Sequence, residues 1–246
     1  MTNMNTQNTN VAIAISSLVF SWNDGRDPVL NIEHLQIKSS ERVFIEGPSG
    51  SGKSTLLSLI AGVTIPQKGA VTVNGIRLNA ISSAARDRSR ADHIGFIYQM
   101  FNLIPFLTVV ENVALPCRFS QHRRIRAANR AGSVETEAIQ LLSTLGMADP
   151  ALVQKPVTDL SVGQQQRVAA ARALIGSPDI LIADEPTSSL DADHREAFIE
   201  LLFKECEREQ TTLVYVSHDR DLETLFDRTI RLVDINAGRN TDSIGE

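Results

Sequence analysis

Short, continuous apolar runs alternate along the chain with segments of helical pattern. The clearest runs are residues 43–45, 94–98, 180–183 and 213–216. Because a strand covered on both faces has no polar side, such runs are typical of the buried strands of a parallel sheet. Their alternation with helices predicts an α/β fold in which a mostly parallel sheet is covered by helices.

Two other parts of the chain show different patterns. Residues 18–22 and 71–73 alternate between apolar and polar positions, and the turn residues Asn74-Gly75 follow the second segment. We expect a smaller antiparallel sheet there, at the edge of the core. From residue 100 to about residue 176 helical runs dominate, and residues 135–145 have the pattern of an amphipathic helix. We interpret this stretch as an inserted helical subdomain.

These patterns divide the chain into a short tail and a single domain. Residues 1–10 are polar and rich in Asn and Thr, so we expect a disordered tail. Residues 11–246 form the domain, with a core of residues 11–98 and 177–246 and a helical subdomain of residues 99–176. No internal repeat is visible, which argues against a solenoid.

Composition narrows the class of protein. The chain has 246 residues, of which 42% are hydrophobic, and a formal net charge of −5. This mild charge argues against a nucleic-acid partner, because nucleic-acid-binding domains usually carry a basic excess. Cys117 and Cys206 have no metal-ligand spacing, and no apolar run reaches the roughly 18 residues that a membrane helix needs. Since the start also lacks a signal-peptide pattern, we expect a cytoplasmic chain that acts at a membrane only through a partner.

Residues 47–55 carry the first chemical motif. The motif consists of Gly47, Pro48, Ser49, Gly50, Ser51, Gly52, Lys53, Ser54 and Thr55. It fits the phosphate-loop pattern G-x-x-x-x-G-K-[S/T], with an apolar strand before it and a helix, residues 54–61, after it. The glycines let backbone N–H groups point at phosphates, Lys53 can reach the β- and γ-phosphates, and the Ser54 hydroxyl can ligate Mg²⁺. An ordinary Gly/Ser-rich turn is the alternative, and both flanking elements disfavour it.

Two acids end the buried strand of residues 180–183. Ligands bind at the carboxyl ends of the strands in parallel α/β sheets, so Asp184 and Glu185 stand where acids are useful. We expect Asp184 to hold Mg²⁺ through water and Glu185 to polarise the attacking water as general base. The alternative is a solvated acidic strand end, which a neighbouring phosphate loop disfavours.

A helix start at residues 160–167 is the third motif. Its sequence is Leu-Ser-Val-Gly-Gln-Gln-Gln-Arg, and the helix that it opens runs to about residue 175. Ser161 and Gln164 fit a capping box, which puts Ser161 at the positive end of the helix dipole. On local physics alone this is simply a good helix start.

Together, the three motifs resemble those of ATP-binding cassette (ABC) proteins. The resemblance covers about residues 11–239 and implies a P-loop NTPase (RecA-like) core, a small antiparallel β subdomain and an inserted helical subdomain. It also implies ATP and Mg²⁺ as ligands and ATP hydrolysis as the activity. In this family the signature helix caps the γ-phosphate held by the opposite subunit, which implies a head-to-tail homodimer in which Ser161, Gly163 and Gln164 contact nucleotide. Val162 departs from the family pattern, which usually has glycine there.

Other residues match the family one position at a time. Gln99 matches the glutamine that touches magnesium and signals to the transporter, and Asp191 matches the aspartate that crosses the dimer interface. His218 matches the histidine that hydrogen-bonds the γ-phosphate; a lone histidine is more often structural, but its spacing after residues 213–216 favours the catalytic role. Trp22 stands where the family usually has a tyrosine that stacks on adenine, although it could instead be a core residue of an edge strand.

Residues 94–116 narrow the resemblance. Their segments Ile-Gly-Phe-Ile-Tyr-Gln, Leu-Ile-Pro and Glu-Asn-Val-Ala-Leu-Pro resemble the lipoprotein-release (LolD) and macrolide-efflux (MacB) branch. The implied protein is a nucleotide-binding subunit, peripheral on the cytoplasmic face of the inner membrane, that drives a separate permease of the LolC/E, MacB or FtsX-like type. Two alternatives stay open: an ABC ATPase that regulates a cell-envelope or cell-division complex without transport, and a soluble non-transport ABC ATPase.

Arginines are concentrated just after this segment. They are Arg118, Arg123, Arg124, Arg126 and Arg130. A solvated helix face is the default explanation for such a cluster, and contact with lipid headgroups or with the permease is the alternative.

Overall fold

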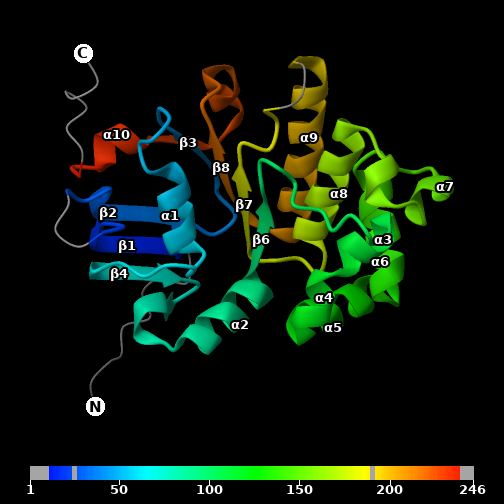
Figure 1. Cartoon of the computed structure of the whole chain (residues 1–246), viewed down its shortest axis with the longest axis horizontal. Coiled ribbons are helices and arrows are strands. Elements are labelled where there is room, and N and C mark those ends of the chain that lie inside the picture. The colour runs from blue at the N-terminus through cyan, green and yellow to red at the C-terminus, as the bar shows by residue number, and fades with distance from the viewer. Residues whose placement is uncertain (1–10, 24–26, 189–191, 239–246) are drawn as a thin grey trace.

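Two sheets and a group of helices make up the part of the chain that the computed structural model describes, residues 11–23, 27–188 and 192–238 (Figure 1). The central sheet is parallel, with the strand order β6-β7-β8-β3-β9. Its strands are β3 (Arg42–Glu46), β6 (Ile94–Ile97), β7 (Ile180–Asp184), β8 (Thr212–Ser217) and β9 (Arg228–Arg231). All four predicted apolar runs lie in this sheet, which confirms the α/β fold; only β6 ends one residue earlier than predicted.

The two faces of the parallel sheet pack into different cores, which explains why its strands are apolar throughout. In β8, Leu213 and Tyr215 belong to the core on the side of α9 and the helical subdomain. Val214 and Val216, between and after them, belong to the core that the sheet shares with α1 and the antiparallel sheet. Since successive residues of a strand point to opposite faces, both parities must be apolar.

The second sheet is antiparallel, as predicted, and lies beside α1 (Figure 1). In the order β2-β1-β4-β5 its strands are β2 (Leu30–Lys38), β1 (Val11–Phe20), β4 (Lys68–Val73) and β5 (Ile76–Arg77). β1 is longer than the predicted segment and ends at Phe20, so Trp22 lies beyond the strand. That position in the turn allows Trp22 to contact the phosphate loop.

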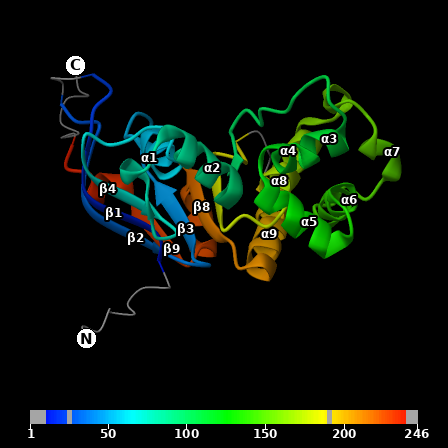
Figure 2. The same ribbon diagram turned by 90° about the horizontal axis from the view of Figure 1, so that it is seen from below.

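The helices outside the helical subdomain flank the two sheets (Figure 2). They are α1 (Lys53–Ile60), α2 (Ser83–His93), α9 (Ala192–Glu209), α10 (Leu232–Ile235) and the 3₁₀ turns η1 (Leu78–Ala80) and η3 (Arg220–Leu225). α1 begins one residue before the predicted helix. The patterns above predict neither α2 nor α9; α2 has no fully buried residue and therefore lacks the apolar stripe that would reveal a helix. No helix within the described ranges is both long and apolar enough to cross a membrane.

The helices between β6 and β7 lie on the side of the parallel sheet away from the antiparallel sheet (Figure 1). They are α3 (Val109–Ala114), α4 (Pro116–Phe119), α5 (Gln121–Ala131), α6 (Val134–Thr144), α7 (Pro150–Val153), the 3₁₀ turn η2 (Val157–Asp159) and α8 (Val162–Leu174). α8 packs directly on β6. A Cβ atom at Gly95 would lie 2.2 Å from the carbonyl oxygen of Ala173, so only glycine permits this approach.

Candidate functional site

The phosphate loop joins β3 to α1, and its carbonyl oxygens bind the side chain of Lys53. Gly52, the residue that caps α1, has φ +104°, and a Cβ atom there would lie 2.8 Å from Cδ2 of Leu30. Its backbone conformation therefore favours glycine, and a larger residue would also displace the end of the Leu30 side chain. Lys53 is 9% exposed and donates hydrogen bonds from Nζ to the carbonyl oxygens of Gly47 (2.6 Å) and Pro48 (3.1 Å). Its ammonium group thus lies inside the curl of the loop, where an anion would meet it.

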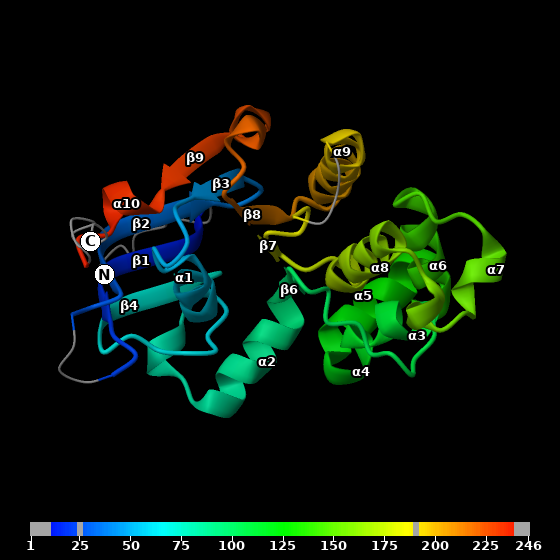
Figure 3. The ribbon, with the colours of Figure 1, turned by 45° about the horizontal axis from the view of Figure 1, so that its top comes forward.

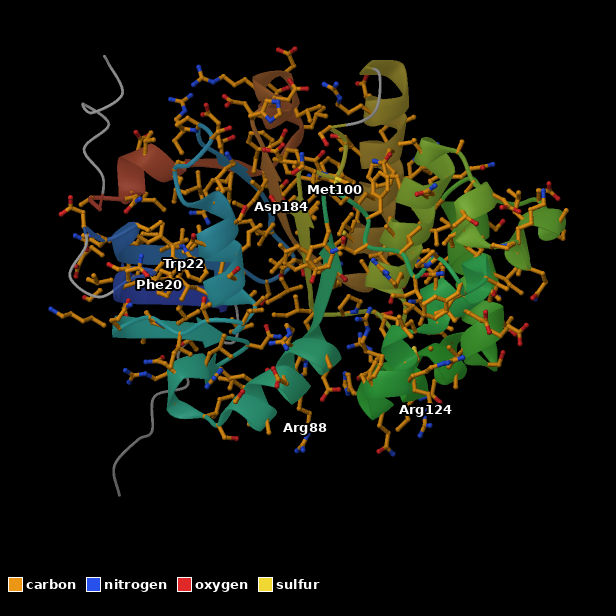
Figure 4. The ribbon with its side chains drawn as sticks, viewed as in Figure 1. Phe20, Trp22, Arg88, Met100, Arg124 and Asp184 are labelled. Atoms are coloured by element: carbon orange, nitrogen blue, oxygen red, sulfur yellow. The ribbon has the colours of Figure 1, made fainter. Side chains whose placement is uncertain are left out.

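A cavity of about 370 Å³ opens in front of this loop. It is lined by Ser49, Gly50, Gly52, Lys53, Ser54 and Thr55 from the loop and α1, and by Trp22, Val29, Gln99, Asp184 and Glu185 from other elements. The cavity lining does not include Gly47, Pro48 or Ser51, which lie in the same loop. The structure therefore brings together predicted site residues from four separate parts of the sequence. Figure 4 shows Trp22 beside the antiparallel sheet, and Asp184 and Met100 near the centre of the molecule.

Trp22 forms one wall of the cavity. The residue is 58% exposed, so it is not a core residue of an edge strand, and that alternative is wrong. Its Nε1 donates to Oγ1 of Thr55 at 3.3 Å, and its ring meets Phe20 edge to face with the ring centroids 5.0 Å apart. These contacts fix a flat apolar ring next to the phosphate loop, where it can stack on another ring.

Oxygen atoms from different elements meet at the end of β7. Oγ of Ser54 lies 3.5 Å from Oδ2 of Asp184, and Gln99 lines the same cavity. Burial raises the pKa of Asp184, and the charge of Glu185 raises it further; a bound cation would favour the carboxylate and oppose this shift. Hydroxyl, carboxylate and amide oxygens are the hard ligands that Mg²⁺ takes, usually together with water and phosphate. These residues therefore fit a Mg²⁺ ion.

Glu185 points into the cavity because its backbone leaves the strand. Its φ is +46°, and its N–H donates to the carbonyl oxygen of Val216 at 2.9 Å. In a regular strand Asp184 and Glu185 would point to opposite faces, whereas here both line the cavity. Such a conformation costs a non-glycine residue about 1–3 kcal/mol and is typical of active sites. His218, which follows β8, lies outside the lining with Nδ1 3.3 Å from Oε1 of Glu185.

The segment after Gln99 is held in a second unusual conformation. Phe101 and Asn102 have φ +58° and +49°. Arg172 of α8 is 9% exposed and donates from Nη2 to the carbonyl oxygen of Phe101 (2.5 Å) and from Nη1 to that of Asn102 (2.7 Å). The loop that carries Gln99 is thus hydrogen-bonded directly to α8.

The start of α8 forms the predicted capping box. The Ser161 N–H donates to Oε1 of Gln164 (2.9 Å), and the Gln164 N–H donates to Oγ of Ser161 (3.3 Å). Ser161 and Val162 are exposed, and Gly163 is half-buried. None of Ser161, Gly163 and Gln164 lines the cavity, and Figures 1 and 3 show α1 and α8 on opposite sides of β7. The signature residues therefore stand apart from the other predicted site residues. Asp191 lies outside the described residues.

The family assignment follows from a family model described as ABC transporter. It matches residues 30–188, a span that includes the phosphate loop, both acids and the start of α8. The chain belongs to the ABC transporter family. Among ABC relatives, the lipoprotein-releasing system ATP-binding protein LolD of Psychrobacter arcticus is 40% identical over 80% of this chain and 84% of that protein. The ABC transporter ATP-binding protein MJ0796 of Methanocaldococcus jannaschii is 41% identical over 82% of this chain and 83% of that protein.

Solved ABC cassettes share the fold. A dimeric post-hydrolysis state of MJ0796 bound to ADP and Pi superposes with a TM-score of 0.75 at 34% identity, covering 92% of this chain and 95% of that chain. A second dimeric structure of MJ0796 gives a TM-score of 0.74 at 36% identity, covering 89% and 93%. The predicted P-loop NTPase fold and the assignment to ABC ATPases are confirmed.

Several residues in and around the cavity are not among those predicted from the sequence. Arg172 belongs to no predicted set, although an arginine among the buried alanines of α8 is a signal, since a buried charge needs a specific partner. Val29 lines the cavity from the segment before β2, and an apolar residue there gives no signal. Oγ1 of Thr187 and the hydroxyl of Tyr215 form a buried hydrogen bond of 2.7 Å beside the turn at Glu185.

Proposed function

We propose that this chain is the ATP-hydrolysing subunit of an ABC transporter and that it works as a head-to-tail homodimer. The observation that carries the proposal is the division of the site: Lys53, Asp184 and Glu185 meet at one cavity, while Ser161 is exposed elsewhere. A second chain in reversed orientation brings its own Ser161 and Gly163 to that cavity. Two copies then enclose two nucleotides, and each copy supplies both kinds of surface.

The nucleotide takes up the cavity with its adenine against Trp22 and its phosphates against the loop. The backbone N–H groups of residues 49–52, the start of α1 and the ammonium of Lys53 all favour negative charge. Ser54, Gln99 and Asp184 would hold Mg²⁺, which would supply positive charge to offset that of the phosphates.

Glu185 acts as the general base of hydrolysis. Its carboxylate accepts a proton from water as the water oxygen attacks the γ-phosphorus and the bond to the β-phosphate oxygen breaks, giving ADP and phosphate. His218, 3.3 Å from Glu185, holds that carboxylate and donates to the γ-phosphate. Asp191 contributes at the dimer interface. Loss of the γ-phosphate removes the contacts that favour the closed dimer, so the subunits separate.

Mixing two inactive variants tests the head-to-tail arrangement. Lys53→Ala disables the cavity, and Ser161→Asp keeps a good N-cap but puts a carboxylate toward the γ-phosphate. Each variant alone hydrolyses little ATP. With random pairing an equal mixture recovers about a quarter of wild-type activity, because half of the dimers are mixed and each mixed dimer has one intact site. No recovery in a mixture whose mixed dimers are demonstrated by cross-linking would contradict the arrangement.

The proposed contact with the permease is a groove lined by residues of α2, β6 and α4, among others. Its volume is about 510 Å³, and Arg90 and Ala91 of α2, Tyr98, and Phe119 of α4 are among its lining residues. Tyr98 immediately precedes Gln99, so a permease segment in this groove touches the loop that reaches the nucleotide cavity. The likeness to LolD and the pattern of residues 94–116 support a permease of the LolC/E, MacB or FtsX-like type, with this chain on the cytoplasmic face of the inner membrane.

Affinity capture from detergent-solubilised membranes tests the permease. Tagged Glu185→Gln chain, trapped with ATP, is expected to retain a permease with a large extracytoplasmic domain. Recovery of a many-helix channel would keep the transporter but overturn the branch, and recovery of soluble proteins alone would favour a non-transport ABC ATPase. Val63 lines the groove and is 62% exposed, so Val63→Arg should abolish capture. Val233→Arg, at a 46% exposed position on α10, is the matched control.

A further inference from the structure

Arg172 joins two parts of the site that lie far apart in the sequence. It is in the third turn of α8, eleven residues after Ser161, so the two residues lie about 16 Å apart along one helix. Its two Nη atoms bind the carbonyl oxygens of Phe101 and Asn102. Residues 98–102, which carry Gln99, are called the Gln99 loop below. α8 thus carries Ser161 at one end and, near the other end, the only described side chain that binds the carbonyls of both Phe101 and Asn102 in this loop.

The Gln99 loop depends on these bonds for its conformation. Two consecutive residues, Phe101 and Asn102, have left-handed backbones, which non-glycine residues adopt only where the surroundings hold them. Within the loop, the Phe101 N–H donates to the carbonyl oxygen of Tyr98 (3.0 Å) and the Asn102 N–H to that of Met100 (2.6 Å). Phe101 is 9% exposed and belongs to the core on the helical side. Arg172 completes this arrangement, because without it the buried carbonyl of Phe101 and the part-buried carbonyl of Asn102 lose their side-chain partner.

A second buried arginine, Arg123, also binds α8 but does not bind the carbonyls of Phe101 and Asn102. Arg123 of α5 is 3% exposed and donates to the carbonyl oxygens of Ile175 (2.8 Å) and Ala173 (2.5 Å). Burial lowers the pKa of Arg123 to about 10 and also lowers the pKa of Arg172. Both arginines are therefore buried cations that bind two carbonyls, but Arg123 binds the end of α8 and Arg172 binds the Gln99 loop.

We propose that Arg172 is a positioning residue that sets the place of Gln99 relative to α8, and so couples the occupancy of the nucleotide cavity to the position of Ser161. The inference rests on the proposed function. When Gln99 moves toward a metal-bound nucleotide, the carbonyls of Phe101 and Asn102 carry Arg172 and α8 with them. Removal of the guanidinium leaves the phosphate loop, Asp184 and Glu185 in place but frees the loop that carries Gln99 from α8.

Steady-state hydrolysis and binding of a fluorescent ATP analogue by the full chain test this inference. For Arg172→Gln we expect the affinity for the analogue to stay within about twofold of wild type, while kcat falls about tenfold, or ~1.4 kcal/mol. The concentration of Mg²⁺ needed for half-maximal rate rises, since Gln99 is displaced from the metal. Arg172→Lys, which keeps a cation with donors, is expected to recover part of the lost kcat.

Arg123→Gln is the matched control, because it also removes a buried guanidinium that binds two carbonyls. It is expected to lower the melting temperature at least as much as Arg172→Gln while leaving the Mg²⁺ requirement unchanged. An unchanged kcat in Arg172→Gln, a parallel loss of analogue affinity, or an equal effect of Arg123→Gln on the Mg²⁺ requirement overturns the inference. If the wild-type chain itself hydrolyses no ATP, the proposed function fails instead, so the two failures are distinguishable.

Discussion

The nucleotide cavity and the start of α8 are built in opposite ways. Around the cavity the backbone is strained at Glu185, and carboxylates, a lysine and an indole converge from separate elements. At the start of α8 the backbone is regular, the capping box satisfies its own N–H groups, and Ser161 faces outward. Strain persists only where surrounding structure enforces it, which marks the cavity as the place prepared for chemistry. The relaxed, exposed helix end is prepared for contact.

The largest expected effect comes from the strained side of this comparison. Glu185→Gln keeps the size and hydrogen-bonding reach of the side chain but cannot accept the proton from water, so we expect hydrolysis to fall by about 10²–10⁴-fold. Because binding groups are untouched, ATP should still be held, and the dimer should accumulate. Phosphate release and size-exclusion chromatography with ATP measure both. A variant that keeps wild-type hydrolysis would remove Glu185 from the role of base.

The relaxed side is tested by changing the charge of Ser161 without losing its cap. Ser161→Asp keeps a strong N-cap, so the free energy of unfolding should change by less than about 0.5 kcal/mol. The new carboxylate repels the γ-phosphate, so ATP-dependent dimerisation and hydrolysis should fall by roughly 100-fold. Ser161→Thr retains the cap and the hydroxyl and is the control. If both variants behave alike, Ser161 acts only on its own helix.

The junction between the two regions is tested at Gly95. A Cβ atom there would lie 2.2 Å from a backbone oxygen of α8, so β6 and α8 must separate in Gly95→Ala. We expect a loss of about 3 kcal/mol in the free energy of unfolding, measured by urea denaturation. Gly132→Ala is the comparison, because no atom lies within 4 Å of that Cβ position and only its φ of +84° opposes alanine. It should lose about 1 kcal/mol.

The smallest expected effect concerns the pH dependence of an ion-pair cluster that joins α2, the start of β7 and α5. His93 of α2 lies 2.6 Å from Asp179, which precedes β7 and also lies 3.4 Å from Arg126 of α5. The hydrogen bond to Asp179 raises the pKa of His93. Burial acts to raise the pKa of Asp179, but the bond and charge of His93 and the charge of Arg126 outweigh it, so that pKa is lowered.

The sign of the effect follows from these two shifts. The stabilisation from His93 is fully present below about pH 6.5, the pKa of an unfolded histidine, and is lost as the pH rises through the higher folded pKa. The stabilisation from Asp179 is present above about pH 3.9 and is lost at lower pH. Between about pH 5.5 and 8 the wild type should therefore lose a few tenths of a kcal/mol more than His93→Gln, because the pair is partly exposed. The free energy of unfolding is measured by urea denaturation at both pH values. If wild type and His93→Gln lose the same amount between them, the ion pair contributes nothing to stability.

Sequence patterns predicted the parts of the molecule whose signal is local. The apolar runs became the parallel strands, because burial on both faces leaves no polar position, and the capping box at Ser161 formed as its four residues indicate. α2 was not predicted because it lies on the surface without an apolar stripe, and so carries no periodic signal.

The site depended more on features that sequence does not display. Adjacent acids in a strand point to opposite faces, so the convergence of Asp184 and Glu185 required the backbone turn at Glu185. The solvated face expected for the arginines after residue 117 is wrong for Arg123, which is buried. Arg130 is exposed and also pairs with Glu137 and Glu209. Arg124 is exposed and fits that interpretation. Partners distant in the sequence decide which arginine is buried, and periodicity contains no information about them.

The capping box has a consequence for what Ser161 can recognise. Its oxygen already accepts the N–H of Gln164, and its own N–H is taken by the Gln164 side chain. The proton of the hydroxyl can thus point outward, at a helix end whose dipole is positive. A ligand with lone pairs and negative charge is favoured there, and a cation is disfavoured. The start of α8 therefore favours an anionic ligand already in the single chain.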